Sequence, residues 1–156
     1  MTFVAKKSLG QNFLNDDKVI KIIADLGKID SDDVILEVGA GTGNLTEIIL
    51  EQSPKKLYVI EKDQRLASYL NEKFGDKINI FNEDMMKFEY ERYYKDKLII
   101  FGNLPYNIST QILAKWIRVK NLDSFCKKFI LMFQKEVADR IIAETNTKNY
   151  GRLSIL

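Results

Sequence analysis

The sequence contains no histidine, a single cysteine and only two prolines among its 156 residues. Histidine is the commonest general base and the commonest zinc ligand, so its absence argues against a Ser-His-Asp triad and against zinc chemistry. Cys126 has no second cysteine with which to form a disulfide within the chain. No apolar run reaches membrane-spanning length, and Lys6, Lys7 and Gln11 interrupt the N-terminal segment before a signal peptide could form. We therefore expect a cytoplasmic protein without membrane contacts.

The length of the chain fits one small domain, and we expect residues 1–156 to form it. A domain of this size buries roughly two thirds of the surface that its unfolded chain exposes, so it needs no disulfide or metal for stability. The net charge is +2, but residues 115–156 carry nine basic and four acidic side chains. Such asymmetry permits contact with phosphate groups and is equally compatible with a solvated surface.

Five short apolar runs rich in β-branched and aromatic residues are typical of buried strands. They cover residues 34–38, 57–61, 78–82, 98–102 and 129–133. Five apolar stripes with helical spacing accompany them: Val19, Ile20, Ile22, Ile23 and Leu26; Leu45, Ile48 and Ile49; Leu66, Tyr69, Leu70 and Phe74; Ile108, Ile112, Leu113, Trp116 and Ile117; Val137, Ile141 and Ile142. Residues 84–97 have the weakest pattern and predict a loop with a short helix. The alternation predicts an α/β fold with a mostly parallel, doubly wound sheet and helices on both faces.

Ligands of such sheets bind beyond the carboxyl ends of the strands, and the first predicted strand ends in a glycine-rich sequence. Gly39, Gly41 and Gly43 lie between this strand and a helix that begins near Asn44. Glycines at this place let the backbone approach a ligand closely. The dinucleotide fingerprint requires a glycine where this chain has Asn44. The spacing therefore favours S-adenosylmethionine as cofactor, although glycine-rich turns also occur for purely structural reasons.

Acidic residues follow the next two predicted strands. Glu61 ends the second strand, where a carboxylate can accept hydrogen bonds from both hydroxyls of a ribose. Its alternative role is that of a helix N-cap, for which Asp63 is the better candidate. Asp84 follows the third strand and could accept a hydrogen bond from the adenine amine of the cofactor, but Glu83 or Asp84 could equally be a solvated turn residue. Glycines and acids at three successive strand ends indicate one groove for an adenosine-bearing ligand.

The fourth predicted strand ends in Asn103, Leu104, Pro105 and Tyr106. The proline biases Leu104 toward extended backbone, so the Leu104 carbonyl can point outward as a fixed acceptor. If the Asn103 side-chain oxygen points the same way, two acceptors converge on the two hydrogens of an exocyclic adenine amine, and Tyr106 offers a face on which the base stacks. The nitrogen then pyramidalises and directs its lone pair at a sulfonium methyl group. A target base must be unpaired or flipped out, which favours single-stranded or loop RNA. The alternative is an ordinary strand-terminating turn.

Four separated blocks, KKSLGQNFL, EVGAGTGNLT, NLPYNIST and FQKEVADRI, resemble the ribosomal small-subunit RNA adenine dimethyltransferases. The residues of these blocks are more similar to this housekeeping branch than to the related macrolide-resistance methyltransferases of the large subunit. The resemblance implies a Rossmann-like S-adenosylmethionine-dependent methyltransferase fold in a single catalytic domain. It implies dimethylation of the exocyclic amines of two adjacent adenines near the 3′ end of small-subunit rRNA, as a step of ribosome biogenesis. The implied partners are this rRNA and the assembling small ribosomal subunit.

The resemblance also assigns residues to roles. Asn12 and Leu14 would lie over the cofactor, although without the resemblance the QNFL sequence is better explained as a surface turn before a helix capped by Asp16. Together with the residues inferred above from their places at the strand ends, the candidate site residues are, for the cofactor, Asn12, Leu14, Gly39, Gly41, Gly43, Glu61, Asp84 and Asn103 and, for catalysis, Asn103, Leu104, Pro105 and Tyr106.

The family's pattern continues past the end of this sequence into further strands and a small helical domain. We interpret the sequence as a catalytic fragment rather than a naturally short relative. The run at 129–133 would then form an exposed apolar edge of the sheet, and we expect self-association through that edge.

Three other functions remain open at this point. An RNA-binding assembly or transcription factor could keep the fold without using the cofactor, but intact Asn103, Pro105 and Tyr106 argue against it. A nicotinamide-dependent oxidoreductase would share the sheet and the acid at 61, but Asn44 and the NLPY sequence do not suit it. DNA adenine methylation usually uses a tetrapeptide with two prolines, where this chain has Leu104 and Pro105.

Overall fold

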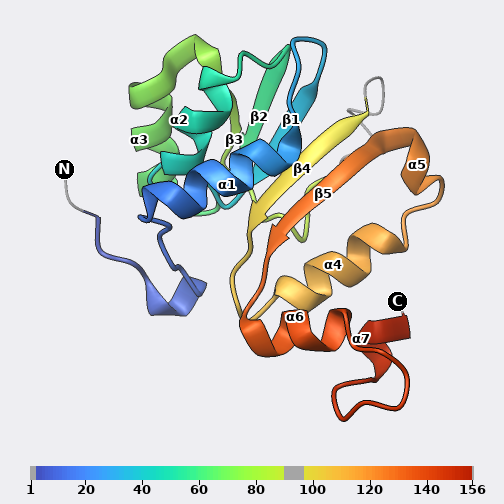
Figure 1. Ribbon diagram of the computed structural model, residues 1–156. Helices are drawn as coiled ribbons and strands as arrows, with labels where there is room; N and C mark the ends of the chain where they lie inside the picture. Colours follow the sequence, from blue (N-terminus) through green and yellow to red (C-terminus); the bar gives the residue numbers. More distant parts are fainter. Residues whose placement is uncertain (1–2, 90–96, 156) are drawn as a thin grey trace.

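A single sheet of five parallel strands organises the computed structural model, which describes residues 3–89 and 97–155 (Figure 1). The strand order is β3-β2-β1-β4-β5. The bounds are β1 Val34–Val38, β2 Lys56–Ile60, β3 Asn79–Phe81, β4 Leu98–Asn103 and β5 Cys126–Met132. The α/β prediction and all five predicted strands are confirmed. Strand β5 begins earlier than predicted because two lysines at its start have partners: Lys127 contacts Asp33, and Lys128 donates to the last carbonyls of α1.

Helices α1 to α3 cover one face of the sheet and α4 the other (Figure 1). As expected, Asp16 caps α1, and Asp63 caps α3. The helices are α1 Asp17–Gly27, α2 Asn44–Glu51, α3 Gln64–Phe74, α4 Ser109–Ile117, α5 Leu122–Phe125, α6 Lys135–Ile141 and α7 Arg152–Ile155, and the 3-10 turns are η1 Lys7–Leu9 and η2 Gly75–Lys77.

The pleat of the strands divides the core into two layers. In β1, Ile35 packs on the side of α1 and α2, whereas Leu36 packs on the side of α4. Side chains of successive strand residues point to opposite faces, so a strand buried on both faces has no polar alternation. All five residues of β1 are buried, including the acidic residue Glu37, which shares the face of Ile35.

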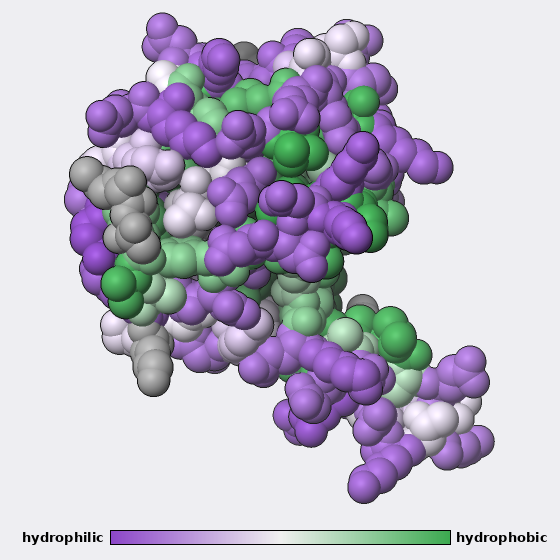
Figure 2. Space-filling model, turned by 60° about the vertical axis from the view of Figure 1, so that its left-hand side comes forward, coloured by the Kyte–Doolittle hydropathy of each residue, from purple (hydrophilic) through white to green (hydrophobic). Residues whose placement is uncertain are grey.

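Two of the predicted stripes lie on helices, as expected, but are only partly buried. In α1, Ile20 and Ile23 are buried, but Val19, Ile22 and Leu26 are 39%, 60% and 57% exposed. Five apolar positions extend further around a helix than the face that one sheet can cover. In α6 no residue is fully buried, and Ile142, just after it, is 76% exposed. Figure 2 shows this C-terminal part projecting from the body of the molecule.

The helix expected within residues 84–97 does not appear in the described part of that segment. Residues 85–87 form a turn, and residues 90–96 lie outside the described residues. The turn is fixed from both sides: Met85 and Phe88 are buried in the core layer of α4, and Lys115 donates to the carbonyls of Met86 and Phe88 at 2.8 and 3.2 Å.

Candidate active site

The strand order reverses between β1 and β4, and the polar motifs meet at the carboxyl ends of these strands. Val38 pairs with Ile60 on one side and with Gly102 on the other. The next residue, Gly39, donates its N–H to the Ile60 carbonyl at 2.9 Å. A Cβ at Gly39 would lie 3.0 Å from the Asn103 carbonyl oxygen. The end of β1 therefore touches the ends of both neighbouring strands, as expected for a doubly wound sheet.

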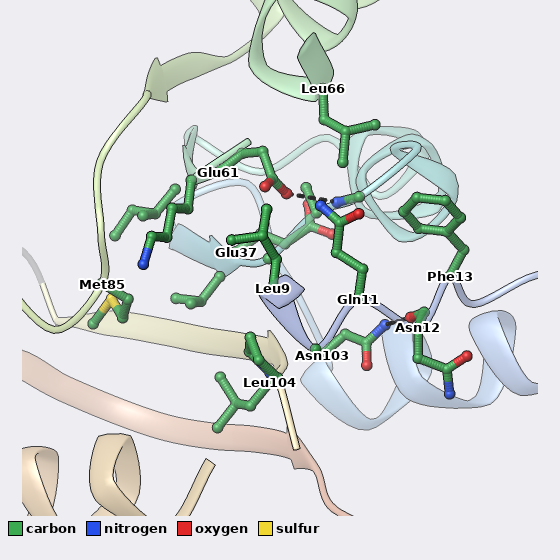
Figure 3. A pocket seen from close by; sticks show the side chains of 18 of the residues that line it. Leu9, Gln11, Asn12, Phe13, Glu37, Glu61, Leu66, Met85, Asn103 and Leu104 are labelled. Atoms are coloured by element: carbon green, nitrogen blue, oxygen red, sulfur yellow. Dashed lines mark hydrogen bonds between the residues drawn. The ribbon is translucent and has the colours of Figure 1, made fainter. Parts of the chain in front are cut away.

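A cavity opens at this edge of the sheet, and most of the predicted site residues line it (Figure 3). Two of the predicted residues, Gly43 and Tyr106, are not among the lining residues. The predicted residues that line it are Asn12, Leu14, Gly39, Gly41, Glu61, Asp84, Asn103, Leu104 and Pro105.

The glycine loop explains why Gly43 lies outside the lining. Gly39 and Gly41 have φ of 74° and 60° and face the cavity, and Gly41 lies against the ring of Phe13. Gly43 has a φ of 79° and is the N-cap of α2. A Cβ there would come within 2.7 Å of both Leu70 and Phe74 of α3. In this structure Gly43 lets two helices approach each other behind the loop.

Glu61 connects the end of β2 to the glycine loop. Its Oε2 accepts a hydrogen bond from the Gly41 N–H at 3.1 Å, and its Oε1 accepts one from the Asp63 N–H at 2.8 Å. The residue is 6% exposed, and burial raises the pKa of its carboxyl group. Each carboxylate oxygen keeps acceptor capacity, because a carboxylate offers about four lone-pair sites.

Asp84 follows β3, the neighbour of β2 in the sheet, and has a cationic partner. Its Oδ2 accepts a hydrogen bond from Lys62 Nζ at 2.8 Å, and its Oδ1 accepts one from the Met86 N–H at 2.9 Å. The Lys62 ammonium lowers the pKa of the Asp84 carboxyl group, which is therefore charged at neutral pH. Its neighbour Glu83 also lines the cavity.

Asn103 faces the N-terminal segment and not the core (Figure 3). Its Nδ2 donates to the Asn12 carbonyl at 2.9 Å, and the Asn12 Nδ2 donates to the Tyr106 hydroxyl at 2.5 Å. Within the described part of the chain, no hydrogen bond uses the Asn103 Oδ1 or the Leu104 carbonyl. Tyr106 lies just outside the cavity with 43% of its surface exposed.

Residues 6–15, which we call the N-terminal strap, form one side of the cavity, which residues 9–14 line. The Asn44 Nδ2 donates to the Leu14 carbonyl at 2.8 Å. At the other end Gln11 Nε2 and Lys6 Nζ reach Asp63 Oδ2 at 3.2 and 3.3 Å. Arg65, with help from these two residues, holds the pKa of Asp63 well below its usual range. The strap is thus tied to the ends of β4 and β2 and to α2, and the QNFL sequence is not a free surface turn.

The sequence interpretation missed Glu37, which lines the cavity from inside β1. Glu37 is 2% exposed, and its Oε2 accepts a hydrogen bond from Thr46 Oγ1 at 2.7 Å. Burial raises its pKa to about 7. A signal was present in the sequence, because an acidic residue inside the otherwise apolar run VILEV requires an explanation.

Two kinds of site are absent from the described residues. They contain no group of three or more histidine, cysteine, aspartate or glutamate side chains that could hold a metal ion. Nor do they include a helix with the length and apolar character needed to cross a membrane.

Comparison with known proteins shows to which family the chain belongs. The model of the ribosomal RNA adenine dimethylase family matches residues 2–156. The chain belongs to this family. Among its curated relatives, the ribosomal RNA small subunit methyltransferase A of Pelagibacter ubique is 55% identical over 97% of this chain and 58% of the relative. The enzyme of the same name from Malacoplasma penetrans is 40% identical over 99% of this chain and 55% of the relative. The predicted resemblance is confirmed, and the chain spans a little over half the length of these relatives.

Solved structures of a dimethyladenosine transferase and of an rRNA methyltransferase share the fold. A dimethyladenosine transferase from Plasmodium falciparum superposes with a TM-score of 0.81 at 32% identity, over 92% of this chain and 51% of that one. The 23S rRNA methyltransferase ErmE superposes with a TM-score of 0.71 at 28% identity, over 90% of this chain and 53% of that one. The predicted methyltransferase fold is therefore confirmed.

Proposed function

We propose that this family member uses S-adenosylmethionine to dimethylate the exocyclic amines of two adjacent adenines near the 3′ end of small-subunit rRNA. The names of its curated relatives support the small ribosomal subunit as the source of the substrate. One observation carries the chemistry: Asn103 and Leu104, whose Oδ1 and carbonyl oxygen have no hydrogen-bond partner among the described residues, line the same cavity as the glycine loop and Glu61.

The cavity has the properties that this cofactor requires. S-adenosylmethionine supplies a methyl group on a positively charged sulfur. Glu37 and Glu61 are buried carboxylates, and in the described part of the chain neither forms an ion pair, so the cavity suits a cationic ligand. Glu61 would accept hydrogen bonds from the ribose, and Asp84 would accept one from the adenine amine, for which its oxygens retain lone pairs beside Lys62. Asn12 and Leu14 would cover the ligand from the strap.

The residues at the end of β4 would act on the target amine. An adenine amine is a weak nucleophile because its lone pair is delocalised into the ring. The Leu104 carbonyl and the Asn103 Oδ1 would accept its two hydrogens, which favours a pyramidal nitrogen with a localised lone pair. The alkylated nitrogen becomes acidic and loses its proton afterwards, so a chain without histidine can perform the reaction. Holding the amine in line with the methyl group is a positioning effect, which can contribute roughly 7 to 11 kcal/mol.

Tyr106 would stack on the target base from outside the cavity. Its hydroxyl is held by Asn12, so the strap and the stacking ring are linked before a base arrives. A base in a duplex would first have to leave the stack at a cost of a few kcal/mol, which favours an unpaired target.

The activity is tested by transfer of a labelled methyl group from S-adenosylmethionine to partly assembled small ribosomal subunits that lack the modification. The expected product is dimethyladenosine at two adjacent positions near the rRNA 3′ end. Binding of the subunit without transfer, by a protein that includes the C-terminal part of its relatives, would favour a non-catalytic assembly factor. Tighter binding of NAD than of S-adenosylhomocysteine in calorimetry would point to an oxidoreductase.

A further inference from the structure

A buried hydrogen bond beneath the glycine loop has no role in the proposed mechanism. It joins Thr46, in the first turn of α2, to Glu37, in β1. Thr46 Oγ1 donates to Glu37 Oε2 at 2.7 Å, and the two residues are 0% and 2% exposed. Burying an acidic residue inside a strand is unfavourable unless something compensates its charge, so the burial of Glu37 requires an explanation.

Thr46 is the only group that the described residues place in hydrogen-bonding contact with the Glu37 carboxylate. Glu61 faces it from the end of β2 and adds electrostatic repulsion. The other titratable groups that line the cavity are Lys62, Glu83 and Asp84, of which Lys62 and Asp84 pair with each other. On α2 itself the neighbouring acid, Glu47, pairs with Lys73 on α3. No cation of the described residues neutralises Glu37.

The strand order places Glu37 between the two ends of the proposed reaction. Glu61 at the end of β2 is assigned to the ribose, and Asn103 at the end of β4 is assigned to the target amine. Strand β1 lies between β2 and β4, and Glu37 is paired in register with Val59 and Phe101 of these strands. The sulfur of the cofactor has to lie between its ribose and the methyl acceptor, and therefore over the end of β1.

We propose that Thr46 is a positioning residue that keeps Glu37 as a carboxylate under the sulfur, and so makes the cavity prefer the cationic methyl donor over its neutral product. This inference rests on the proposed function, because it assumes the same cofactor. Methyl transfer converts the sulfonium into a neutral thioether, while the rest of the molecule keeps its charges. A carboxylate near the sulfur thus distinguishes donor from product, and a protonated Glu37 does not.

The hydroxyl of Thr46 matters because a hydrogen bond to a carboxylate favours its charged form. Burial opposes this and brings the pKa of Glu37 to about 7, so at neutral pH the group lies close to its midpoint. Removal of the hydroxyl raises the pKa further and leaves the group mostly neutral at pH 7. Raising the pH restores the charge.

The test compares Thr46→Val, which keeps the shape and removes the donor, with Thr46→Ser, which keeps the donor. Calorimetry measures the binding of S-adenosylmethionine and of S-adenosylhomocysteine at pH 7.0 and at pH 8.5, far enough apart to change the charge of a group that titrates near neutral pH. For the valine variant we expect about three- to five-fold weaker binding of the methyl donor at pH 7.0, near-normal binding at pH 8.5, and product binding within about two-fold at both. The serine variant should follow the unmodified protein.

The outcomes separate this inference from the proposed function. If the unmodified protein binds neither ligand, the proposed function fails. If it binds both, and the valine variant loses affinity equally for donor and product or equally at the two pH values, Thr46 has only a structural role and the inference is overturned. An unchanged valine variant would overturn it as well. Retained product binding shows that the variant is folded.

Discussion

Asn103 is the side chain on which the proposed chemistry depends most directly. Its Oδ1 has no hydrogen-bond partner among the described residues, while its Nδ2 is held by the strap. We expect Asn103→Ala to bind S-adenosylmethionine within a few-fold of the unmodified protein and to lose nearly all methyl transfer. Calorimetry and labelled transfer measure the two effects. Asn79→Ala, at an exposed amide of β3, is the matched control, and unchanged turnover of the Asn103 variant would remove this residue from the mechanism.

Glu61 should act on binding before it acts on catalysis. The carboxylate holds the glycine loop through Gly41 and is placed to accept hydrogen bonds from a ribose. Loss of hydrogen bonds to a charged group predicts that Glu61→Ala weakens cofactor binding by about one to two orders of magnitude. Titration calorimetry checks this against Glu72→Ala, which changes an exposed acid of α3. Equal affinities for both variants would mean that Glu61 does not contact the cofactor.

Glu37 should make the stability of the protein depend on pH. Burial raises the pKa of Glu37 from 4.5 to about 7, so the folded protein holds the proton of this group more tightly than the unfolded chain does. The resulting stabilisation of the fold is complete below pH 4.5 and is lost as the pH rises through 7. Glu37→Gln cannot ionise and can still accept from Thr46. As the pH rises between these values, the free energy of unfolding of this variant should increase relative to that of the unmodified protein, by up to about 3 kcal/mol.

Urea unfolding at pH 5 and pH 8 measures the effect of the Glu37 variant. The control is Glu51→Gln, which makes the same substitution at an exposed acid at the end of α2. A Glu37→Gln variant whose advantage is the same at both pH values would show that folding does not raise the pKa of Glu37.

At the scale of elements, the contact between α2 and α3 depends on the absence of one side chain. Gly43 has a φ of 79°, and a Cβ there would come within 2.7 Å of Leu70 and Phe74. Left-handed backbone costs a non-glycine residue about 1 to 2 kcal/mol before any clash. Gly43→Ala should therefore destabilise the fold by at least this amount in urea unfolding. Gly151→Ala, with open space around the new Cβ, should be close to neutral, and similar stabilities for the two would contradict the argument.

The strap is the element whose role could least be predicted from local pattern. Its polar residues show no helical or strand period, and its order comes from the groups that it contacts: Asp63, Asn44 and Asn103. These partners lie on three different elements that are distant in sequence. A turn with exposed polar residues and a closing segment over a cavity have the same composition, so family resemblance was needed to identify it.

At the scale of the whole molecule, β5 forms one edge of the sheet in the described residues, and β3 forms the other. Edge strands present unpaired backbone groups to which another strand can add. We expect this chain to self-associate as its concentration rises, which light scattering will measure. Ile22→Lys changes the exposed apolar face of α1 and leaves the edge intact, so it should not reduce association if the edge is responsible. A strictly monomeric chain at high concentration would exclude the edge as an interface.

The sequence by itself determined the elements of this protein and much of its cavity. Strands, helices and their caps depend on neighbouring residues, and the glycine loop, Glu61 and Asn103 follow strands, so a parallel sheet has to bring them to one edge. Only the tertiary structure decided which face of α1 is covered, why Gly43 must be a glycine and which groups the cavity holds. Asn12 and Asn103 are 91 positions apart, and Glu37 meets Thr46 across two elements. Such contacts depend on how the elements pack, which no local pattern of residues records.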